Sequence, residues 1–203
     1  MKVKIYVEGG GEGRVLKTEC KKGFSQLLQK CLINRKMPEI HPGGSRNNTY
    51  ELFKTSLLVN EPHTCSILLV DSEDPVSTTD FWTHLQIRDG WERPNGASDE
   101  QVHLMITCME SWIMADHDGI ISFFGSRTRR NALLPLHNLE QRHRHDVQDS
   151  LEAATEDCGR ERAYKKGKRS FQVLATLDST KLNQNLSSFR HFIEYLNQVL
   201  EYR

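Results

Sequence analysis

Apolar and polar positions alternate along the first residues of the chain and then change period. Residues 2–7 (KVKIYV) alternate, which predicts a strand that ends at Glu8, and a loop of four glycines follows within residues 9–13. From about Glu12 to Leu32 the apolar positions recur at steps of three and four, as on one face of a helix. Residues 66–70 (SILLV) form a continuous apolar run before Asp71, which is typical of a strand buried on both faces of a parallel sheet.

The remaining pattern completes an α/β arrangement. A short strand is predicted at residues 37–41 and a helix at 50–57, capped by one of residues 47–49. The order strand, helix, strand, helix, strand predicts a right-handed, mostly parallel sheet flanked by helices. Residues 101–108 favour a fourth strand, with a helix as the alternative, and residues 109–116 and 120–124 favour helices. Residues 126–146 form a polar excursion, and residues 189–200 form an amphipathic helix.

Length and composition limit the classes of protein. With 203 residues we expect one domain, 1–203, with a core at about 1–125 and a basic loop and helical extension at about 126–203. Lys and Arg number 27, as do Asp and Glu, so nucleic-acid binding requires a local basic patch or a partner. No segment approaches the roughly 20 apolar residues of a membrane span. The start lacks the apolar stretch of a secretory signal, and the five cysteines are widely spaced, so we expect a cytoplasmic protein with reduced thiols.

Acidic side chains follow two of the predicted strands. Glu8 and Asp71 each stand directly after a strand, and the carboxyl ends of parallel strands meet at one edge of the sheet. Glu12, Glu73 and Asp74 lie close to them in the sequence. Like charges at one edge repel each other unless a cation compensates them, and Mg²⁺ or Mn²⁺ prefers such oxygen ligands. Two simpler interpretations stay open: Glu12 can stabilise a helix start, and the residues before Pro75 can form a turn.

The glycine loop does not match a nucleotide-binding motif. Arg14 occupies the position of the last glycine in GxGxxG, and the GK[ST] ending of a P-loop is missing. Glu8 and Glu12 on either side would also repel a phosphate that lacks a cation.

Several segments together resemble the domain-of-unknown-function 4276 family. They are VEGGGE (7–12), LLVDSEDPV (68–76), RDGW (88–91), QVHLMITCMESWIMAD (101–116) and SFQVLATLD (170–178). The early Glu and the later Asp-x-Glu are also similar to the TOPRIM pattern of Glu and DxD. The resemblance implies a TOPRIM-like fold in bacterial proteins often encoded beside an AAA-type or ABC-like ATPase. It also implies kinship with the nuclease effector AriB of the PARIS anti-phage system and with OLD-type nucleases.

The resemblance implies roles for individual residues. Glu8, Glu12, Asp71 and Glu73 become candidate metal ligands. The segment Asp71-Ser72-Glu73 departs from DxD because Glu73 has a longer side chain than Asp, so Asp74 is a candidate metal ligand in place of Glu73. In the segment 109–116, Asp116 also matches the family, Trp112 is expected in the core, and Glu110 is a candidate second-metal ligand or general base. The alternative for Glu110 is a structural pair with a lysine.

A basic segment, residues 160–169, lies near the end of the chain and carries six Lys and Arg side chains. Its six cations can bind a phosphate backbone while an aromatic ring stacks on a base, or they can belong to a solvated loop. Lys168 can instead stabilise the transition-state phosphate. The histidines at 137, 143 and 145 lack metal-motif spacing and are expected in a polar loop. The predicted nucleic-acid contacts are Arg160, Arg162, Tyr164, Lys165, Lys166 and Arg169.

The acidic edge predicts a nuclease that uses Mg²⁺ or Mn²⁺, and the family resemblance implies a toxic effector in anti-phage defence that an ATPase partner controls. The expected catalytic residues are Glu8, Glu12, Asp71, Glu73 and Lys168. One alternative is a non-catalytic subunit that docks on an ATPase and has an exposed C-terminal helix. Another is a nucleotidyl transferase or primase-like polymerase with the same acidic edge. The choice between RNA and DNA, and the presence of a homodimer, stay open.

Overall fold

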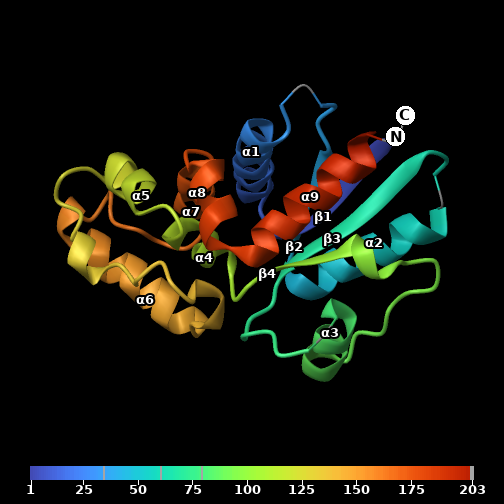
Figure 1. The fold of residues 1–203 in the computed structure, drawn as a ribbon. Coiled ribbons are helices and arrows are strands. Elements are labelled where there is room, and N and C mark those ends of the chain that lie inside the picture. Colours follow the sequence, from blue (N-terminus) through green and yellow to red (C-terminus); the bar gives the residue numbers. More distant parts are fainter. Residues whose placement is uncertain (34, 60, 79, 202–203) are drawn as a thin grey trace.

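The sheet is built from parallel strands alone. The computed structural model describes residues 1–33, 35–59, 61–78 and 80–201. In this part of the chain, β1 (Lys2–Gly10), β2 (Glu39–Gly44), β3 (Thr64–Asp71) and β4 (Val102–Met105) form one sheet in the order β2-β1-β3-β4. All three neighbouring pairs are parallel. The predicted α/β class, with a parallel sheet flanked by helices, is confirmed (Figure 1).

Helices cover both faces of this sheet. α1 (Arg14–Cys31) and α9 (Ser187–Glu201) lie on one face, whereas α2 (Arg46–Val59) and α3 (Phe81–Asp89) lie on the other (Figure 1). The apolar run of β3 serves both layers, because alternate side chains of a strand point to opposite faces. Ile67 and Leu69 pack in the cluster of α1 and α9, and Leu68 and Val70 pack in the cluster of α2 and α3.

The other helices gather beside α1, near the ends of β3 and β4 (Figure 1). They are α4 (Met109–Met114), α5 (His117–Phe124), α6 (Arg144–Thr155), α7 (Lys168–Leu174) and α8 (Ser179–Asn185). Short 3-10 turns occur at Asp99–Gln101, Arg130–Ala132, Leu139–Gln141 and Glu156–Cys158. The apolar side chains of α4 to α8 belong to one cluster with those of β1, β3 and α1, so residues 126–203 extend the same hydrophobic core.

Most predicted elements are found, although β1 extends past Glu8 to Gly10 and α3, α6, α7 and α8 are not among the elements predicted from the sequence. The second strand begins at Glu39 rather than at 37, and the fourth strand is confirmed over its helical alternative. The polar excursion ends where α6 begins, at Arg144. The expectation of an exposed C-terminal helix is wrong for its apolar face, because Phe189 and Phe192 are buried against Trp112. No helix in the described ranges is both long and apolar enough to cross a membrane.

Candidate metal and phosphate site

A pocket of about 290 Å³ opens where β1 and β3 end. The glycines that follow Glu8 form one wall, and the first residues of α4 and α7 form the opposite side. Gly9 and Gly10 at the end of β1, and Gly11 after it, all have positive φ angles, a conformation that favours glycine. The charged residues that line the pocket are Glu8, Asp71, Glu110 and Lys166, and its apolar wall is made by Leu16, Met109 and Phe171.

Asp71 is the most deeply placed residue of the predicted acidic edge. Asp71 is the last residue of β3 and is 7% exposed. Its Oδ1 accepts a hydrogen bond of 2.8 Å from the backbone N–H of Met109. Burial, together with the negative charges of Glu8 and Glu110, raises the pKa of the Asp71 carboxyl well above its usual range, and Lys166 acts in the opposite direction. The environment therefore disfavours the charged carboxylate until a cation is added.

Glu110 lies on the other side of the same pocket, in the first turn of α4. It is fully buried, and its Oε1 accepts a hydrogen bond of 2.6 Å from the Tyr164 hydroxyl. Within residues 1–33, 35–59, 61–78 and 80–201, its Oε2 has no hydrogen-bond partner, and neither Glu110 nor Asp71 forms an ion pair. The structural pair with a lysine is thus not found. Two buried carboxylates without a cationic partner fit a divalent cation with oxygen ligands.

Glu8 is held by an arginine that the sequence did not single out. Its Oε2 accepts hydrogen bonds from Arg46 Nη1 at 3.0 Å and from the backbone N–H of Asp71 at 3.2 Å. Arg46 begins α2 and also donates to the backbone carbonyl of Asp71. Asp89 binds its guanidinium through two hydrogen bonds of 2.7 and 3.0 Å, and the Trp91 ring lies 4.9 Å below it. The RDGW segment thus supplies the support for Arg46.

Glu73 belongs to the acidic group but is also compensated by arginines. Oxygen atoms of Glu8, Asp71 and Glu73 lie within 4.8 Å of one another, which is close enough for a shared cation. Glu73 also contacts Arg144, and Arg88 lies 3.6 Å away. Of the carboxylates expected at this edge, Glu8 and Glu73 are therefore compensated by arginines, whereas Asp71 forms no ion pair among the described residues.

Two other acidic candidates lie apart from this group. Glu12 is exposed, does not line the pocket and does not belong to the group of Glu8, Asp71 and Glu73. Asp74 is also exposed, and its carboxylate lies 3.4 Å from Arg88. Asp116 has a structural environment: it caps α5 through the N–H of Gly119 and pairs with Lys181 at 3.1 Å.

The basic segment contains both buried and exposed side chains. Tyr164 is 3% exposed, so the prediction that its ring stacks on a base is wrong for this structure. Lys168 lies 3.8 Å from Glu19 and does not line the pocket, whereas Lys166 does. Arg169 donates to the backbone carbonyl of Arg162 at 2.9 Å. The cationic side chains of this segment that are exposed and lack an ion pair among the described residues are Arg160, Arg162, Lys165 and Lys166.

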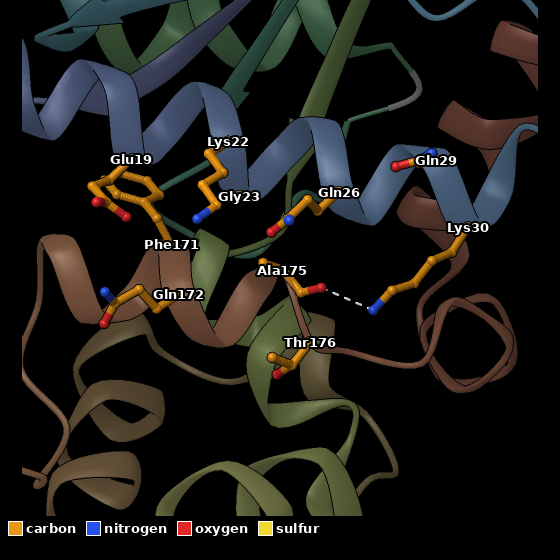
Figure 2. Close-up of a pocket in the computed structure, with 10 residues that line it drawn as sticks. All are labelled: Glu19, Lys22, Gly23, Gln26, Gln29, Lys30, Phe171, Gln172, Ala175 and Thr176. Atoms are coloured by element: carbon orange, nitrogen blue, oxygen red, sulfur yellow. Dashed lines mark hydrogen bonds between the residues drawn. The ribbon is translucent and has the colours of Figure 1, made fainter.

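A second hollow, of about 500 Å³, lies between α1 and α7 (Figure 2). Lys30 of α1 donates hydrogen bonds of 2.9 Å to the carbonyls of Ala175 and Leu177, which follow α7. Figure 2 shows Gly23 facing Phe171 across the same joint. None of the predicted site residues lines this hollow, and its hydrogen bonds fix α7 against α1.

Of the three histidines expected in a polar loop, His145 lies instead in the first turn of α6. In the described part of the chain, His137, His143 and His145 join no group of three potential metal ligands. His143 precedes α6, where its Nδ1 accepts a hydrogen bond of 3.4 Å from the N–H of His145.

The fold and the pocket define an α/β protein with a candidate cation site at the carboxyl ends of its parallel strands. A family model described as "Domain of unknown function (DUF4276)" matches residues 7–197. The chain therefore belongs to the DUF4276 family. Comparison with curated proteins and with solved structures gives no match.

Proposed function

We propose that this protein is a nuclease that hydrolyses phosphodiester bonds of DNA or RNA with Mg²⁺ or Mn²⁺. The observation that carries the proposal is the pair Asp71 and Glu110. Both carboxylates are buried, both line one pocket, and neither has a cationic partner among the described residues. A structural role alone does not require two such groups in one pocket, because their repulsion costs stability.

The charged residues at the pocket have roles in the proposed chemistry. Glu8, Asp71 and Glu73, whose carboxylate oxygens lie within 4.8 Å of one another, would hold the metal, with Glu110 as a further ligand from the other side of the pocket. When bound, the metal activates water and stabilises negative charge on phosphate. Arg46 and the N–H of Asp71 fix the orientation of the Glu8 carboxylate. Lys166, at the wall of the pocket, is the cation placed to bind the substrate phosphate, a role we assign to it instead of Lys168.

The similarity to TOPRIM proteins supports the same function. Glu8 lies near the end of β1, Asp71 ends β3 and Glu73 follows it, which matches the pattern of an early Glu and a later DxD. By the same similarity, we infer a cytoplasmic effector of anti-phage defence that is controlled by an AAA- or ABC-type ATPase. The four exposed cations of the basic segment are consistent with a nucleic-acid substrate.

One group of contacts favours a second candidate function. Arg46 neutralises Glu8, while Arg88 and Arg144 neutralise Glu73. Such pairs can stabilise a site that has no metal, so the second candidate is a non-catalytic subunit of an ATPase complex.

Calorimetric titration with Mn²⁺ and Mg²⁺ separates the two functions. We expect the wild type to bind Mn²⁺ and the double variant Asp71→Asn, Glu110→Gln to lose this binding while it stays folded. Asp74→Asn is the matched control, because it removes an exposed carboxylate next to the same site. Mn²⁺-dependent cleavage of plasmid DNA or RNA should be lost with the same double variant. A folded wild type that binds neither ion would favour the non-catalytic subunit.

A further inference from the structure

A chain of hydrogen bonds connects the pocket to the basic segment. The N–H of Gly167 donates to Ser170 Oγ at 3.1 Å, and the hydroxyl oxygens of Ser170 and Tyr164 lie 2.9 Å apart. The Tyr164 hydroxyl donates to Glu110 Oε1 at 2.6 Å. Because each hydroxyl has one proton and the tyrosine gives its proton to Glu110, the serine must donate to the tyrosine. The direction of the whole chain is therefore fixed, and each hydroxyl in it both donates and accepts.

The members of this chain are shielded from solvent, although the segment that they hold is exposed. Tyr164, Ser170 and Glu110 are 3%, 1% and 0% exposed, whereas Lys165 and Lys166 lie on the surface. The N–H of Tyr164 also donates to Thr155 Oγ1 at 2.8 Å, which ties it to α6. Charge-assisted hydrogen bonds in such an environment are stronger than those at a surface. Tyr164 thus anchors the basic segment to the buried core.

The two ends of the chain lie at the same pocket. One end is the Glu110 carboxylate, whose Oε2 has no hydrogen-bond partner among the described residues. The other end is Gly167, directly after Lys166, and both of these residues also line the pocket. A cation on Oε2 would fix the Glu110 carboxylate, and through Tyr164 and Ser170 it would fix the backbone next to Lys166.

We propose that Tyr164 is a positioning residue that couples cation occupancy of the pocket to the placement of Lys166. On this basis the cation orders the basic segment, and binding of a nucleic-acid phosphate backbone is strengthened by prior binding of the metal. The coupling is reciprocal, so phosphate binding also strengthens metal binding. The inference rests on the proposed metal site and adds the order in which metal and substrate bind.

Limited digestion with trypsin tests the coupling, because trypsin cleaves after Lys165 and Lys166 and requires the segment to open. In the wild type we expect Mn²⁺ to slow cleavage after Lys166, relative to cleavage after the exposed Lys36 in the same digest. In Tyr164→Phe we expect faster cleavage without metal and no protection by Mn²⁺. Calorimetry of this variant should show Mn²⁺ affinity reduced about tenfold, as when a hydrogen-bond partner of a metal ligand is removed.

Two further variants make the result specific. Tyr195→Phe is the matched control, because it removes another tyrosine hydroxyl, 3.6 Å from Cys65 and remote from the pocket, and it should behave like the wild type. Ser170→Ala breaks the chain at its middle and should reproduce Tyr164→Phe if that variant folds poorly. Equal protection by Mn²⁺ in the wild type and in folded Tyr164→Phe or Ser170→Ala would overturn the coupling while leaving the metal site in place. A wild type that binds no Mn²⁺ would overturn both proposals.

Discussion

Carboxylates at the carboxyl end of the sheet differ in the groups that contact them. Glu8 and Glu73 contact arginine side chains, whereas the hydrogen bonds to Asp71 and Glu110 come from a backbone N–H and a hydroxyl group. Neutral donors compensate a buried negative charge only in part. At the residue scale, this end of the sheet therefore combines two carboxylates that arginines neutralise, Glu8 and Glu73, with two that have no ion pair among the described residues, Asp71 and Glu110.

Arg46 contacts Glu8, Asp89 and the backbone carbonyl of Asp71, so its replacement should strongly lower the free energy of unfolding. Arg46→Met leaves Glu8 and Asp89, which are mostly buried, without their shared partner. Loss of one member of a buried ion-pair group costs about 3 kcal/mol in the free energy of unfolding. Urea denaturation measures this change, and the added substitution Asp89→Asn should restore part of it.

Arg129→Met is the matched control for Arg46→Met. Arg129 pairs with Glu156 and Asp157, but these side chains are largely exposed, and exposed pairs contribute less than about 1 kcal/mol. Equal losses of stability in the two variants would contradict a special role of Arg46.

At the scale of elements, the pocket depends on the contact between α1 and α7. α7 brings Ser170 and Phe171 to the pocket, and it lies close to α1 at Gly23. A Cβ atom built on Gly23 would lie 2.6 Å from the carbonyl oxygen of Phe171, a backbone atom that cannot rotate away. The glycine is therefore required by close approach of the helices, although it lies within a helix.

Gly23→Ala should consequently destabilise the protein, against the usual trend. In a helix interior, Ala is more favourable than Gly by about 1 kcal/mol, but overpacking costs about 1–3 kcal/mol. We expect a lower midpoint of urea unfolding together with weaker Mn²⁺ binding, since α7 must move. Gln26→Ala, an exposed change in the same helix, should alter neither quantity. A more stable Gly23→Ala variant would show that α7 does not depend on this contact.

The elements themselves were largely predictable from the sequence, but their contacts were only partly so. Periodicity located β1, α1 and β3 because burial on one or both faces leaves a direct trace in the order of residues. Strand ends then placed Glu8 and Asp71 together. The pairing of Arg46 with Asp89 has no such trace, because it depends on how two helices lie on the sheet. Likewise, six cations around Tyr164 suggested an exposed ring, whereas tertiary packing buries it.

At the scale of the whole molecule, a buried histidine joins the sheet to the C-terminal helix. His103 of β4 is 1% exposed, and its ring centroid lies 5.6 Å from that of His191, 5.0 Å from Phe192 and 5.1 Å from Tyr195 of α9. Burial, with a smaller effect of His191, lowers the pKa of His103 to about 3, from an ordinary value of 6.5. The folded protein therefore holds this ring neutral over a range in which the unfolded chain would protonate it.

The sign of the resulting pH dependence follows from proton binding. Because the pKa of His103 is lower in the folded state, its protonation favours unfolding, so its contribution to stability is complete above pH 6.5 and decreases as pH falls toward 3. The full loss is on the order of 5 kcal/mol. We expect His103→Leu to unfold with a flatter pH dependence between pH 6.5 and 4, measured by urea denaturation at a series of pH values. His137→Leu, at an exposed position, should retain the wild-type slope. An unchanged slope in His103→Leu would mean that carboxylates elsewhere in the molecule, and not the joint between β4 and α9, control its acid stability.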